Sequence, residues 1–288
     1  MIFTTEALST QNLSFLTQQK TQCPPCLCGE IYTNLFLDMK LSTISFREIG
    51  RRLGLDARMV DGRLRVKRIM PLPMWCWRLS AQSSFCRAVV ASGLLTKRQM
   101  VHAALRYRLG CSKDDAVIYW QIDQMGHVLD GKLMWYGPDC HRVKKRNASW
   151  VMSRLKTHFG IPQEAFQPQH CFFGSHLLNF QLNTVCIVEA EKSAVILSER
   201  FPEYIWLAAG GMSELQPEKF RPLRGYRVIL FPDTDPDGRA YKTWYDAAQR
   251  VMQSFFWPKG NRIYVSNFLE LHASADQKRR KIDLVDYL

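Results

Sequence analysis

The sequence predicts an α/β protein whose C-terminal part is a mainly parallel sheet covered by helices on both faces. Short apolar strands alternate with helices from residue 183 onward, which is the pattern of βαβ units. Between residues 116 and 136 the pattern is strand–turn–strand, which predicts a smaller α+β subdomain before the parallel sheet. The first 80 residues are basic and largely helical in pattern. These changes divide the chain into predicted segments 1–80, 81–182 and 183–288.

The composition is that of an ordinary globular protein, with 47% hydrophobic and 23% charged residues among 288. The longest apolar runs, such as 185–188 and 228–231, have the length of strands, whereas a membrane span needs about 20 apolar residues. The first residues lack the basic start and continuous apolar core of a signal peptide. The nine scattered cysteines favour free thiols over a disulfide framework. We therefore expect a cytoplasmic protein that does not enter a membrane.

The net charge of +13 is concentrated in one part of the chain. Residues 40–110 carry a net charge of +12, whereas residues 1–39 carry −2 and residues 111–288 carry +3. Such a block suits counterion release from a phosphate backbone, although a solvated helical surface or an acidic protein partner remains open. Within it, residues 44–66 have helical spacing interrupted near Gly54, and they resemble a helix-turn-helix. Arg51 and Arg52 are candidate phosphate ligands in this segment.

Three cysteines near the N-terminus, Cys23, Cys26 and Cys28, raise the question of a zinc site. A zinc ribbon needs a second Cys or His pair about 12–20 residues further on. The next cysteine is Cys76 and the first histidine is His102. The spacing therefore predicts that no zinc is bound here.

The middle segment is expected to begin with a helix and continue as a hairpin. Helical spacing covers residues 85–107, strands are expected over 116–123 and 127–136, and a further helix is expected near 150–159. A basic run, Lys144, Lys145 and Arg146, follows the second strand. This run suits phosphate binding, and a solvated loop is the alternative.

The C-terminal segment carries the βαβ pattern. Strands are expected over 184–188, 204–208, 227–231 and 261–265, with helices over 192–200 and 240–253. In an open α/β sheet, functional groups collect beyond the carboxyl ends of the strands. Two of these ends carry acids: Glu189 follows the first strand, and Asp233 and Asp235 follow the third.

Three carboxylates at neighbouring strand ends would repel one another unless a hard cation lay between them. Mg²⁺ suits such a site because it takes oxygen ligands and keeps waters for substrate phosphates. Each acid also has a structural alternative. Glu189 would stabilise the N-terminus of the following helix, and 233–238 would be a turn, since each of its residues favours turns.

The sequence around these acids resembles the Toprim domain of bacterial primases, topoisomerases and some nucleases. VCIVEAEKSAVIL, which begins at Val185, and VILFPDTDPDG, which begins at Val228, are similar to the two motifs of that domain. By this resemblance Glu189, Asp233 and Asp235 take its metal-binding and catalytic positions, and the sheet is of the Rossmannoid type. The sequence departs from the family at Ala190, where Gly is common, and at Ser193, where primases commonly have Asp.

The resemblance extends over about residues 85–288, including CFFGSHLL at 171–178 and the ending KIDLVDYL at 281–288. It is nearest to the primase-like Toprim proteins of bacterial mobile elements. It implies that the segment 81–182 is a primase-like subdomain and that Lys144, Lys145 and Arg146 lie in a cleft for template or nucleotide phosphates. Lys192 could support a phosphate at a helix N-terminus, and an ordinary surface lysine is the alternative.

These expectations lead to a primase-like nucleotidyl transferase that uses Mg²⁺ or Mn²⁺, with nucleotides and a single-stranded DNA or RNA template as partners. A Toprim DNA- or RNA-binding protein without turnover, and a Toprim nuclease, remain alternatives. The sequence has no G-x-x-x-x-G-K-[ST] motif, so any unwinding would fall to a separate helicase.

Overall fold

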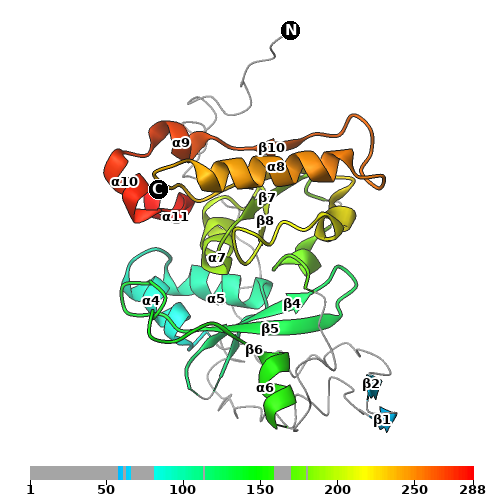
Figure 1. Ribbon diagram of the computed structural model, residues 1–288. Coiled ribbons are helices and arrows are strands. Elements are labelled where there is room, and N and C mark those ends of the chain that lie inside the picture. The colour runs from blue at the N-terminus through cyan, green and yellow to red at the C-terminus, as the bar shows by residue number, and fades with distance from the viewer. Residues whose placement is uncertain (1–57, 61–62, 66–80, 113, 159–169, 180) are drawn as a thin grey trace. The chain divides into compact units, whose positions relative to one another are not determined.

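The computed structural model describes residues 58–60, 63–65, 81–112, 114–158, 170–179 and 181–288, which all fall in one compact unit formed by residues 43–288. This unit contains one four-stranded parallel sheet and one four-stranded antiparallel sheet with helices around them (Figure 1). The predicted α/β class is therefore confirmed. Among the described residues, no helix is long and apolar enough to cross a membrane.

The parallel sheet has the strand order β10-β9-β7-β8, so β7 and β9 are its central strands. The bounds are β7 Thr184–Val188, β8 Ile205–Ala208, β9 Arg227–Phe231 and β10 Ile263–Val265. All three pairings are parallel, so the four carboxyl ends lie at one edge. Figure 1 shows that this edge is on the side of the C-terminal helices, α9 (Phe268–His272), α10 (Ala275–Arg280) and α11 (Leu284–Tyr287).

Different helices cover the two faces of the parallel sheet (Figure 1). On one face, Trp244 of α8 (Arg239–Gln253) belongs to the same buried cluster as Ile187 of β7 and Leu230 of β9. The short helix η4 (Pro217–Leu223) adds Phe220 to this core. Side chains of a strand alternate between the two faces of a sheet. The other face of this sheet is covered by α7 (Glu191–Arg200), which contacts β7 and β8. The expected double cover is present.

The antiparallel sheet has the order β3-β4-β5-β6. The bounds are β3 Gly110–Cys111, β4 Val117–Ile122, β5 Val128–Met134 and β6 Ser149–Trp150, and α6 (Val151–His158) follows directly. Every residue of β4 is buried. The expected hairpin is therefore present, and its first strand lies inside the protein rather than at an exposed face.

The helix expected over 85–107 is two helices, α4 (Ser84–Ala91) and α5 (Lys97–Arg106). Gly93, with a φ of 72°, lies between them. Thr96 then begins α5, because its side chain accepts a hydrogen bond from the Gln99 N–H while the Gln99 side chain accepts one from the Thr96 N–H. The single-helix prediction was wrong because helical spacing continues through this break.

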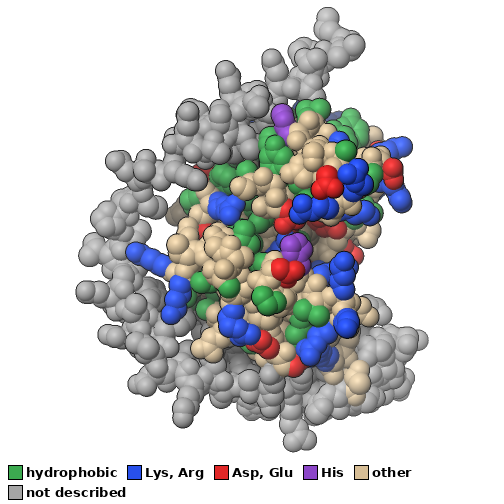
Figure 2. Space-filling view, turned by 90° about the vertical axis from the view of Figure 1, so that its left-hand side faces the viewer, with side chains coloured by type: hydrophobic (Ala, Val, Ile, Leu, Met, Phe, Trp, Pro, Cys, Tyr) green, Lys and Arg blue, Asp and Glu red, His purple; other side chains and the backbone are tan. Residues whose placement is uncertain are grey.

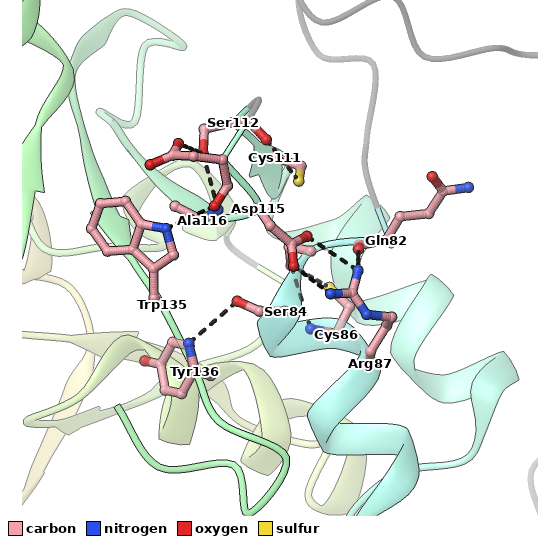
Figure 3. A network of polar contacts seen from close by, with 12 residues as sticks. Gln82, Ser84, Cys86, Arg87, Cys111, Ser112, Asp115, Ala116, Trp135 and Tyr136 are labelled. Atoms are coloured by element: carbon pink, nitrogen blue, oxygen red, sulfur yellow. Dashed lines mark hydrogen bonds and ion pairs between the residues drawn. The ribbon is translucent and has the colours of Figure 1, made fainter. Parts of the chain in front are cut away.

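A network of polar contacts fixes the start of α4 to the antiparallel sheet (Figure 3). The guanidinium of Arg87 forms an ion pair with Asp115, and the Ser84 N–H donates to the Asp115 carbonyl at 3.2 Å. The Ser84 hydroxyl in turn accepts a hydrogen bond from the Tyr136 N–H at 3.2 Å. The residues just before β4 and just after β5 are thus both tied to the N-terminal part of α4.

Tyr107, just after α5, joins the antiparallel half to the parallel sheet. Its buried hydroxyl donates to the Trp206 carbonyl of β8 at 2.7 Å, and its ring stacks on Phe173. Phe173 forms a β-bridge with Ala208, just before the short helix η3 (Ser175–Leu177). At Gly174, whose φ is 88°, a Cβ atom would meet the Trp206 carbonyl oxygen at 3.1 Å, so a side chain there would be strained.

One prediction for the N-terminal segment needs correction. Residues Arg58–Val60 and Arg63–Arg65 form an antiparallel strand pair, β1 and β2, where the second helix of the helix-turn-helix was expected. Asp61-Gly62 separates the strands in the sequence, and this dipeptide is a strong hairpin signal that helical spacing obscured.

Other calls for this segment lie outside the described residues: Arg51, Arg52, the three N-terminal cysteines and the rest of 44–66. The segment boundaries near residues 80 and 182 stay predictions.

Candidate active site

Glu189 and Asp233 lie just beyond the carboxyl ends of the two central strands of the parallel sheet. Glu189 directly follows β7, and Asp233 follows β9 with only Pro232 between. Val188 and Phe231 are register partners, so the two acids leave adjacent strands at neighbouring points. The structure therefore brings these two acids to the same edge, as the sequence predicted.

The two carboxyls influence each other. Burial raises the pKa of the Asp233 carboxyl well above its usual range, and the nearby Glu189 and Asp283 raise it further. Burial also raises the pKa of the Glu189 carboxyl, while the positive charge of Lys132 acts in the opposite direction. The negative charge at this edge is therefore incompletely compensated, and a cation held between the acids would relieve the repulsion.

Asp283 belongs to the same acidic group, although it comes from the C-terminal end of the chain. It caps α11 by accepting a hydrogen bond from the Asp286 N–H, and its other oxygen accepts one from the Ser193 hydroxyl at 2.6 Å. The backbone next to it is fixed as well, because the Thr234 N–H donates to the Ile282 carbonyl at 3.1 Å. The C-terminal helices thus pack directly against the loop that carries Asp233.

The Asp235 carboxylate, unlike that of Asp233, is held by backbone hydrogen bonds. Its Oδ1 accepts hydrogen bonds from the N–H groups of Asp237 and Arg239 at 2.9 and 3.1 Å, and its Oδ2 accepts one from Ala240. Burial raises the pKa of the Asp235 carboxyl, but these donors outweigh burial and hold the pKa below its usual value. The side chain closes the loop and caps α8, which is the turn alternative that the sequence offered.

Replacing Asp235 with Ala should destabilise the protein by about 0.5–2 kcal/mol, since the start of α8 loses its capping carboxylate. Asp235→Asn keeps an acceptor oxygen and should cost less. Urea unfolding of the two variants beside the parent protein measures the difference. Equal stability of all three proteins would show that α8 does not depend on this carboxylate.

Lys132 connects the antiparallel sheet to this edge, and sequence reasoning missed it. Its ammonium group contacts both oxygens of Glu191, at 2.9 and 3.1 Å, and donates to the Gly210 carbonyl at 3.0 Å. Glu191 lies in the first turn of α7 and is nearly fully buried. The only sequence signal was a lysine inside the hairpin strand β5, whose sequence is VLDGKLM.

Lys192 was predicted to meet a phosphate, and the structure places it beside acids. Its ammonium group lies 3.3 Å from Asp283 and 3.4 Å from Asp286. Burial lowers the pKa of Lys192, but the two acids outweigh burial and hold the pKa above its usual value. Lys192 therefore supplies a fixed positive charge near Asp233 and holds α11 against α7.

The basic run at 144–146 forms an exposed turn after β5. Arg146 pairs with Asp114 at 3.7 Å, and its guanidinium lies over the Trp135 ring at 5.2 Å from the ring centroid. One of the three basic groups is therefore engaged within the antiparallel half. A role for Lys144 and Lys145 in phosphate binding stays a prediction.

Acidic side chains gather over the middle of the face that lies toward the C-terminal helices, and basic side chains lie around them (Figure 2).

Within the described part of the chain, no group of three or more His, Cys, Asp or Glu side chains is arranged to hold a metal ion. Glu189, Asp233 and Asp235 do not form such a group, and their role as metal ligands stays a prediction. Glu189 and Asp233 are carboxylates at adjacent strand ends, and Mg²⁺ is commonly held by one or two carboxylates together with waters and substrate phosphates.

Comparison with known proteins identifies the family. Residues 84–234 match the family described as "Domain of unknown function (DUF6371)", and the chain belongs to this family. The matched segment begins at α4 and includes both Glu189 and Asp233. A search of the curated proteins finds no match.

Solved structures that are similar to this chain include two from bacteriophage T7. The primase fragment of the bacteriophage T7 primase-helicase protein is 16% identical with a TM-score of 0.40, over 62% of this chain and 69% of that one. The second structure contains primase domains of two gp4 subunits with bacteriophage T7 lagging-strand DNA polymerase, an RNA/DNA hybrid and dTTP. It is also 16% identical, with a TM-score of 0.38, over 61% of this chain and 82% of that one.

Proposed function

We propose that this protein is a nucleic-acid-binding, primase-like nucleotidyl transferase that acts in the DNA replication of a mobile element. The observation that carries the proposal is the pair of mutually repelling carboxyls, Glu189 and Asp233, at adjacent carboxyl ends of a parallel sheet. The resemblance of the surrounding sequence to the Toprim motifs supports the same reading. A site of this kind suits chemistry on phosphates, because it takes a hard cation.

Glu189 and Asp233 would hold a Mg²⁺ ion, which neutralises negative charge on a phosphoryl group in transfer. Two lysines provide fixed positive charge around the pair: Lys132 acts to lower the pKa of Glu189, and Lys192 acts to lower the pKa of Asp233. The N-cap residue of α7 is Ala190, whose side chain makes no capping hydrogen bond. The N–H groups at the start of this helix would favour an anion such as a nucleotide phosphate nearby.

Primer synthesis tests the proposal. The full chain should join nucleotides into a primer on a single-stranded DNA template in the presence of Mg²⁺ or Mn²⁺. Glu189→Gln or Asp233→Asn should abolish primer formation. Asp246→Asn is the matched control, since Asp246 is an exposed acid on α8 away from the strand ends. Retention of full activity in either site variant would rule out the assignment.

The same reactions separate the alternatives. Loss of the template instead of product formation, again dependent on Asp233, would identify a nuclease. A mobility shift without product or template loss would identify a binding protein without turnover. A second reaction series with a helicase added would show whether unwinding by a partner is needed on duplex DNA.

A further inference from the structure

Residues 221–227 and 254–264 lie at the amino edge of the parallel sheet, at the opposite end of α8 from the C-terminal helices (Figure 1). Together they carry an aromatic and basic surface. We call it the amino-edge patch. It consists of Arg221, Arg224, Phe255, Phe256, Lys259 and Arg262. We infer that the amino-edge patch is a binding site for single-stranded nucleic acid, with a base stacked on Phe255 and phosphates beside the arginines.

Phe255 is 92% exposed, the highest value among the large exposed hydrophobic side chains of the described residues. Its exposure is built into a turn. The Trp257 N–H donates to the Ser254 carbonyl at 3.1 Å, so residues 254–257 form a β-turn with Phe255 and Phe256 at its two central positions. The turn is anchored by Trp257, whose indole is buried and donates to the Asn261 carbonyl at 3.1 Å. Phe255 is therefore held out toward solvent by a fixed backbone.

Arg221 lies against both phenylalanines. Its guanidinium carbon is 5.8 Å from the Phe255 ring centroid and 5.1 Å from the Phe256 centroid. The preceding residue, Phe220, is fully buried, so Arg221 leaves η4 from a fixed position. A flat aromatic face beside a guanidinium is the arrangement that stacks a base and pairs with its phosphate.

The two segments that form the amino-edge patch contain basic residues and no acids. Residues 221–227 hold three arginines, and residues 254–264 hold Lys259 and Arg262. A hydrogen bond joins the segments, since the Asn261 side-chain amide donates to the Arg224 carbonyl at 2.9 Å. Positive charge next to an exposed aromatic side chain favours a polyanion with flat bases over a neutral apolar partner.

A second aromatic–arginine pair extends this edge. Arg227, at the start of β9, lies over the ring of Tyr264 on β10, 5.4 Å from the centroid. Tyr264 is itself among the exposed large hydrophobic residues. Repeated pairs of this kind suit successive nucleotides of one strand, since each base offers an aromatic face whatever its sequence.

The test measures binding of fluorescent oligo(dT) and oligo(U) to the full chain in EDTA. Phe255→Ala should weaken binding by about 5-fold or more, the loss of one stacked base. Phe255→Trp should retain the affinity, and Phe255→Leu should lose it, because leucine keeps an apolar surface without an aromatic face. Arg221→Gln should make the log–log salt dependence shallower by about 0.7. Met125→Ala, at another exposed hydrophobic residue, is the matched control and should bind normally.

Cross-linking locates the contact. An oligonucleotide with 5-iodouracil should attach to the peptide that contains Phe255. The relative affinities for oligo(dT) and oligo(U) decide between DNA and RNA. Unchanged affinity of Phe255→Ala, normal binding by Phe255→Leu, or no oligonucleotide binding at all would each overturn the inference. Asp233→Asn should bind normally in EDTA, so the outcome is independent of the proposed active site.

Discussion

Asp233→Asn should raise the melting temperature of the metal-free protein at about pH 8 while it removes Mg²⁺-dependent activity. In the folded protein the pKa of the Asp233 carboxyl is raised by burial, Glu189 and Asp283. The protonated form is therefore favoured by folding, and its stabilising contribution is present below the ordinary pKa and lost as the pH rises through the raised value. Asparagine keeps the neutral state at every pH. We expect a gain on the order of 1 kcal/mol, or about 2–4 °C.

Thermal unfolding at about pH 5 and about pH 8, with EDTA or with Mg²⁺, measures this effect. The variant should gain more at the higher pH, and Mg²⁺ should stabilise the parent protein but not the variant. The control Asp246→Asn should follow the parent protein under all four conditions. A lower melting temperature of Asp233→Asn at the higher pH would show that the carboxylate is compensated by its neighbours without any metal.

Lys132→Met should destabilise the protein by about 3–5 kcal/mol, the largest stability loss expected from any single change described above. Lys132 and Glu191 are both well buried, with 12% and 3% of their side chains exposed. Removing the ammonium group leaves the Glu191 carboxylate without its partner in a buried position. The Gly210 carbonyl loses a hydrogen-bond donor at the same time.

A double-mutant cycle separates the ion pair from simple packing. Glu191→Gln removes the buried charge, so Lys132→Met should cost much less in that background than in the parent protein. Urea unfolding of the four proteins gives the coupling free energy. Costs that simply add would mean that Lys132 acts through its aliphatic chain and not through its charge.

The parallel sheet and its two central acids were predictable because local patterns determine them. Five-residue apolar strands, separated by helices, fixed the positions of β7 and β9, and strand ends of a parallel sheet must share an edge. Glu189 and Asp233 followed from that geometry alone. By contrast, the ammonium of Lys132 reaches Glu191 across 59 positions of the chain, and no local pattern encodes such a contact.

Asp235 shows a different limit of the sequence. Asp233 and Asp235 are two positions apart after the same strand, so spacing alone predicts both of them equally as metal ligands. The positive φ of Gly238, 65°, turns the chain into α8, and the N–H groups of this turn converge on Asp235 and not on Asp233. This loop conformation, which spacing does not encode, gives the Asp235 oxygens their backbone donors.

The central position of β7 in the sheet has a consequence for how the protein folds. β7 pairs with β8 and also with β9, and the second pairing closes a loop of about forty residues. Non-local parallel pairing of this kind forms slowly, because the entropy of the loop is lost before its contacts exist. Glu189 and Asp233 therefore meet only when the pairing of β7 with β9 has formed. Until then the two acids are apart, so their mutual repulsion opposes this pairing and not the formation of the separate βα units.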